Sequence, residues 1–86
     1  MKLKLKGSEV AAGTSSTNGS NVDTATLVQV HNAGGTARLV SLETSAAALI
    51  GTFTIAPNAT EMLDKTSTDE IFAAHDDVKL VEVTYS

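Results

Sequence analysis

The sequence predicts a small all-β domain, and three observations support this. Apolar and polar residues alternate over residues 1–6 and 47–55, as they do in strands with one buried face. β-Branched residues are concentrated in the run 24–31. Gly, Pro and Asn separate the β-prone runs at short intervals, a spacing that is typical of a β-sandwich or barrel. We therefore expect five or six short strands that pair mainly antiparallel.

The expected strands follow one another through tight connections. In the first strand, residues 1–6, the leucines are expected to face the core and the lysines solvent. The stretch HNAGG, residues 31–35, predicts a hairpin bend, because glycine tolerates the positive φ that such turns need. A second turn is expected at APNAT, residues 56–60. The further strands are expected over residues 24–31, 36–42, 47–55, 61–65 and 78–85.

One helical element is expected between the last two strands. Ser67 and Glu70 have the spacing of a capping box, in which each side chain bonds the backbone of the other residue. Asp69 and Glu70 also suit the positive end of a helix dipole. A short helical turn is therefore expected near residues 67–75.

Together these elements predict a small antiparallel β-sandwich or half-open barrel with an immunoglobulin-like layout. The 86 residues suffice for one domain, residues 1–86. Within it, eleven of the fifteen residues of segment 7–21 are Gly, Ser, Thr or Asn, a composition that favours a flexible connection. An alternative is that this segment is an arm that becomes ordered against a neighbouring subunit.

The charge distribution limits the classes of partner. The net charge of −4 argues against general nucleic-acid binding, which needs a basic face. No apolar run approaches the length of a membrane span, and the start MKLKLK lacks the apolar region of a signal peptide. We expect a protein assembled inside the cell. Residues 61–86 carry seven acidic residues and two lysines, which indicates either a solvated face or a surface for a basic partner.

The residues that could carry chemistry do not form a convincing site. His31 and His75 are the only side chains that normally titrate near neutral pH, and no nucleophile motif accompanies them. The acidic pair beside His75 lacks a calcium-loop spacing, and the glycines of HNAGG lead into a strand rather than into the helix that a phosphate loop requires. We therefore expect no enzyme, cofactor or metal site. A glycan-binding module stays a further alternative, although the aromatic residues are few, namely Phe53, Phe72 and Tyr85.

From Thr24 onward the order of features resembles that of small virion structural proteins of tailed bacteriophages. The matching stretches are HNAGGTA, RLVSL, IGTFTIAPNATEMLDK, TSTDEIFA and VKLVEVTYS, within residues 24–86. Lys65, Thr68, Asp69 and Ile71 occupy the Lys and Thr-Asp-x-Ile positions of such proteins. The resemblance implies a capsid decoration (cement) protein, a homo-oligomer located in the virion that docks on the major capsid protein lattice. A head–tail joint or tail component is the second choice.

Under this hypothesis the functional residues are surface contacts. The candidates are the basic start with the arm 7–21 and the acidic residues near the expected helix. For any single one of them, a solvated face is the favoured explanation. The candidate residues are Lys2, Lys4, Lys6, Asp69, Glu70, Asp76 and Asp77.

Overall fold

A computed structural model describes residues 3–85, without the side chains of Leu3 and Tyr85. Lys2 and the expected directions of those two side chains therefore lie outside the described part. The described residues form eight strands and one short 3₁₀ turn, η1 (Ser16–Asn18). The strands are β1 (Leu3–Leu5), β2 (Val10–Ala11), β3 (Leu27–Asn32), β4 (Arg38–Glu43), β5 (Leu49–Ile55), β6 (Thr60–Asp64), β7 (Glu70–Ala73) and β8 (Val78–Tyr85). The all-β prediction is confirmed.

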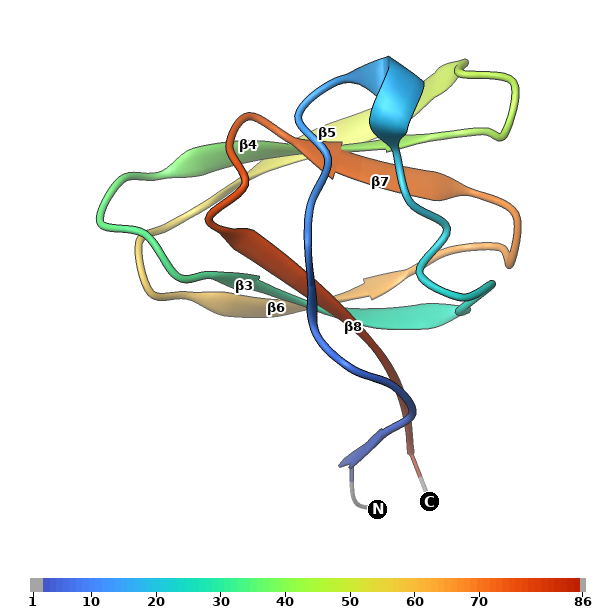
Figure 1. Ribbon diagram of the computed structural model, residues 1–86, viewed down its shortest axis with the longest axis horizontal. Helices are drawn as coiled ribbons and strands as arrows, with labels where there is room; N and C mark the ends of the chain where they lie inside the picture. The colour runs from blue at the N-terminus through green and yellow to red at the C-terminus, as the bar shows by residue number, and fades with distance from the viewer. Residues whose placement is uncertain (1–2, 86) are drawn as a thin grey trace.

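Two antiparallel sheets are stacked against each other (Figure 1). One has the strand order β1-β8-β3-β6, and β2 also pairs with β8. The other has the order β5-β4-β7. The chain crosses between the sheets at each of the connections β3–β4, β5–β6, β6–β7 and β7–β8, and this crossing produces the sandwich.

The N-terminal segment closes one side of the sandwich. After β1 it runs along β8, where Val10 pairs with Leu80, and then reaches the second sheet (Figure 1). There, isolated bridges join Gly13 to Phe72 and Ser20 to Ile71. The composition of residues 7–21 predicts a flexible connection, but backbone hydrogen bonds fasten this segment to β7 and β8.

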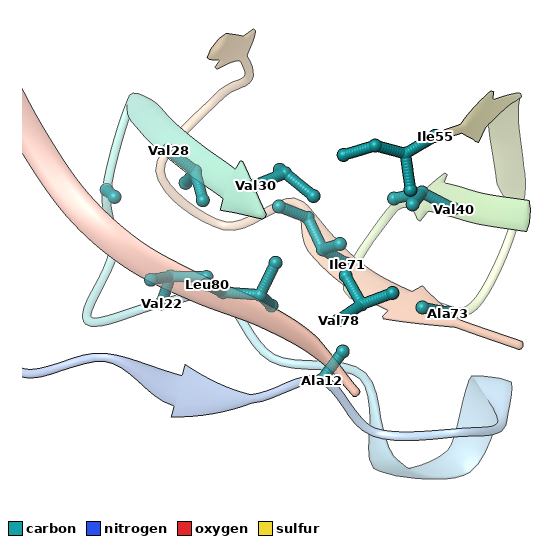
Figure 2. Packing of buried hydrophobic residues seen from close by; sticks show 11 residues of the cluster. Ala12, Val22, Val28, Val30, Val40, Ile55, Ile71, Ala73, Val78 and Leu80 are labelled. Atoms are coloured by element: carbon teal, nitrogen blue, oxygen red, sulfur yellow. The ribbon is translucent and has the colours of Figure 1, made fainter. Parts of the chain in front are cut away.

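The core lies between the sheets and consists of small and medium aliphatic side chains (Figure 2). Burial alternates along β3 as the strand pattern predicts, so that Val28 and Val30 point inward. Figure 2 shows these side chains approaching Ile71 and Leu80 from β7 and β8. Further core members are Ala12, Val22, Ala25, Val40, Ile55, Ala73 and Val78.

Asn32 connects two loops at one end of the sandwich. Its side chain is fully buried, and its Nδ2 donates to the carbonyls of Thr36, at 2.8 Å, and Ile55, at 3.3 Å. Its Oδ1 accepts the N–H of Gly34 at 3.0 Å. The hairpin bend predicted at HNAGG is wrong, because the strands on either side of it, β3 and β4, belong to different sheets and do not pair. None of the described glycines has a positive φ, so the expected reason for the glycines is wrong.

The short helical turn expected near residues 67–75 is wrong. Residues 70–73 form strand β7 instead, with Ile71 and Ala73 buried in alternation. The N–H of Asp69 donates to the carbonyl of Thr66 at 3.1 Å, and the Asp69 carboxylate accepts the N–H of Thr66 at 3.3 Å. This reciprocal pair closes a turn one residue earlier than the expected capping box, and pairing with β4 then holds the following residues extended.

Candidate interaction surfaces

The basic start of the chain forms an edge strand. In β1, Lys4 lies opposite Thr84 and Leu5 opposite Val83. The prediction that Leu5 faces the core is wrong, because its side chain is 68% exposed. Leu5 lies opposite Val83 of β8, and its side chain is open to solvent. Lys4 and Lys6, the residue directly after β1, are also exposed, and in an extended strand their side chains point to the face opposite to Leu5.

Lys6 leads into a cluster of charges at this end of the molecule. Its Nζ lies 3.7 Å from Oε2 of Glu82, an ion pair that contributes little because Lys6 is half-exposed. Burial lowers the pKa of Lys65, while Asp69, Glu82 and Glu70 act in the opposite direction. Nζ of Lys65 donates to the carbonyl of Thr66 at 3.0 Å. Lys6 therefore pairs with Glu82, and the carboxylates of Glu82, Asp69 and Glu70 all lie near enough to Lys65 to act on its pKa.

The other two acidic candidates lie in the turn between β7 and β8. Asp76 is exposed, whereas Oδ2 of Asp77 accepts from Nη2 of Arg38 at 3.2 Å. Burial raises the pKa of Asp77, but the hydrogen bond and charge of Arg38, together with His75, lower it below the usual value. A Cβ at residue 34 would overlap Oδ2 of Asp77, which explains the glycine there. Asp77 is therefore an internal contact, whereas Asp76 is exposed and its Oδ1 lies 3.2 Å from Nδ1 of His75.

Glu43 is a buried carboxylate that the sequence reasoning missed. It is 1% exposed on the outer face of β4, and its Oε1 accepts from the Ser16 hydroxyl at 2.6 Å. Within residues 3–85, Oε2 has no hydrogen-bond partner. A Cβ at residue 19 would lie 2.7 Å from this oxygen and 3.2 Å from Oε1 of Glu70. Gly19 thus allows the chain to pass close over both glutamates.

The free edge of β5 is the second feature that sequence reasoning missed. Among the described strands, β5 pairs with β4 alone, so one of its edges is free. Leu49 is 64% exposed and Ile50 51% exposed, and the strand LIGTFTI contains no ionisable residue. β6, an edge strand of the other sheet, carries exposed Glu61 and Asp64. Proteins commonly protect strand edges with charges, so β5 differs from β6 in lacking this protection.

No family model, curated protein or solved structure matches the chain. Over the described range 3–85, no three His, Cys, Asp or Glu side chains gather in a way that could hold a metal ion, and the surface has no detectable pocket. No helix of that range is long and apolar enough to cross a membrane. The exposed strands β1 and β5 are therefore the features on which a functional proposal can be built.

Proposed function

We propose that this chain is a structural protein of a tailed-bacteriophage virion, namely a decoration protein that docks on the major capsid protein lattice and stabilises the head. The resemblance of residues 24–86 supports the class of protein. The exposure of Leu5 on the edge strand β1 carries the proposed mode of docking. An apolar side chain surrounded by polar groups is the usual centre of a protein–protein contact.

The position of β1 supports a partner other than a second copy of this chain. β1 is paired with β8 and ends the path of its sheet. Two copies of β1 would bring lysines against lysines, and such like charges oppose pairing. A capsid surface that covers the edge of β1 would remove Leu5 from water, and acidic groups at the rim of that surface would attract Lys4 and Lys6.

The test is cosedimentation of the full chain with empty heads of the phage. We expect the wild-type chain to bind, and Leu5→Asp to bind at least about tenfold more weakly, the effect of about 1.4 kcal/mol. Leu39→Asp is the matched control, because Leu39 is also an exposed strand leucine but lies on β4 of the other sheet. Point variants are preferable to removal of residues 1–21, since Ala12 belongs to the core.

Three outcomes would contradict parts of this proposal. A wild-type chain that does not bind heads contradicts the decoration role, and binding to purified tails or connectors would favour the joint or tail alternative. Equal binding of Leu5→Asp and wild type would exclude β1 as the contact.

The glycan-binding alternative gains no support from the described aromatic rings, because Phe53 and Phe72 are both half-buried.

A further inference from the structure

We propose that the free edge of β5 binds the same strand of a second copy of this chain. In this dimer two β5 strands pair antiparallel about a two-fold axis and join the two three-stranded sheets into one continuous sheet. The inference deepens the proposed function by naming the contact through which the protein forms a homo-oligomer. It uses a different strand from the proposed docking contact, so each can be tested separately.

The backbone of β5 provides the first argument. Along an edge strand, alternate N–H and C=O groups point away from the neighbouring strand and are available to another chain. In β5 the carbonyl of Ile55 already accepts a hydrogen bond from the side chain of Asn32. Among the described residues, no backbone hydrogen bond outside the β4 pairing involves residues 49–54. The register shift between Leu42 and Glu43 affects only the first residues of β5, so the part from Gly51 is regular.

The absence of charge in β5 provides the second argument, and it favours a second copy as the occupant. Each copy carries a net charge of −4, so association is easiest where acidic side chains do not face each other. In any antiparallel register of residues 49–54, neither strand places an ionisable side chain against the other. Two β6 edges would instead bring together strands that each contain Glu61 and Asp64.

The side chains of β5 complete the match. Thr52 and Thr54 are exposed on the outer face of the sheet, beside Ser41 and Leu39 of β4. Cross-strand Thr–Thr contacts and contacts among β-branched residues stabilise antiparallel pairs. A two-fold axis lets the same short strand supply both halves of the contact, as in isologous dimers. The exposed Leu49 and Ile50 would lose contact with water at the ends of the paired strands.

Sedimentation equilibrium of the full chain over a wide concentration range tests the proposal. We expect a mass that rises from 8.9 kDa for one chain toward twice that value. Thr52→Lys places a cation on each edge and is expected to weaken dimerisation at least tenfold. Thr68→Lys is the matched control, because it makes the same change in an exposed turn and is expected to dimerise as wild type does. Circular dichroism verifies that both variants are folded.

Hydrogen exchange of the wild-type chain gives a second readout that needs no variant. Amides within residues 49–54 are expected to exchange more slowly in concentrated than in dilute samples, while amides of β6 do not change. A chain that stays monomeric at its highest soluble concentration would overturn the proposal, even if it binds another protein through β5. Dimers without concentration-dependent protection in β5 would overturn it too. Head binding by a monomeric chain would contradict the dimer alone, and dimers that fail to bind heads would contradict the docking proposal alone.

Discussion

Replacing Asn32 by alanine is expected to destabilise the fold by about 3 kcal/mol. The substitution removes three hydrogen bonds, to the carbonyls of Thr36 and Ile55 and from the N–H of Gly34. The bond to Ile55 is buried, and a buried carbonyl that loses its partner costs about 1–3 kcal/mol. The other two bonds are partly buried, and each contributes about 0.5–1.5 kcal/mol. A chain of this length has a total stability of about 4–13 kcal/mol, so the loss is a large fraction of it.

Urea denaturation followed by circular dichroism measures this loss, and a thermal scan should show a fall in Tm of about 12–24 °C. The matched control is Asn21→Ala, because the exposed Asn21 side chain accepts only a long, 3.4 Å bond from the N–H of Thr24. We expect that control to change stability by less than about 0.5 kcal/mol. A cost for Asn32→Ala below about 1 kcal/mol, or equal to that of the control, would refute the role assigned to this side chain.

Three further predictions concern charges and backbone strain. The pKa of Asp77 is lowered in the folded state, so its ionised form stabilises the fold at pH values above its usual pKa of 3.8, and this contribution is lost as the pH falls through the lowered pKa. The stability difference between wild type and Asp77→Asn should therefore shrink below about pH 4. A difference that stays constant in urea titrations at several pH values would contradict this prediction. Ala47 has φ 65°, a left-handed conformation that strains alanine but not glycine. The free energy of unfolding of Ala47→Gly should therefore exceed that of Ala46→Gly by about 1–2 kcal/mol, the usual penalty of this conformation. Equal free energies would argue against strain at Ala47. Glu43→Gln replaces a buried carboxylate that has no basic partner among the described residues, and it should leave stability unchanged or raise it by about 1 kcal/mol. A large loss in the same assay would show that the carboxylate is needed.

The strands that could be predicted are those with a strong local pattern. Alternation with one buried face indicates β5, and β-prone runs between turn residues indicate β3, β4 and β8. β7 was mistaken for a helical turn because Ser67 and Glu70 match a capping box. Pairing with β4 holds Ile71 and Phe72 extended. A local sequence pattern contains no information about such pairing with a distant strand.

The polar N-terminal segment shows a second limit of sequence reasoning. Its composition gives no core signal, yet backbone hydrogen bonds to β7 and β8 hold it against the fold. That placement is what buries Glu43, whose oxygen accepts the Ser16 hydroxyl, and no periodicity in RLVSLE could have revealed it. The free edge of β5 was also missed, because the alternation of LIGTFTI indicates a strand but not its position in a sheet.

Among the residues predicted as contacts, the structure separates exposed side chains from those with internal partners. Lys4 and Asp76 are exposed, whereas Asp77 bonds Arg38 and Asp69 bonds the turn at Thr66. Spacing along the chain could not make this distinction, since it depends on which strands are neighbours. For Leu5 the alternation predicts a place in the core, whereas its side chain is exposed.

An electron-microscopy reconstruction of the phage particle tests the central claim most directly. The account predicts density for this chain on the outer surface of the head, with β1 and Leu5 against the capsid lattice and β5 strands paired between copies. A head surface without this chain would contradict the decoration role. A bound chain that turns β1 toward solvent would contradict the docking contact that the exposed Leu5 supports.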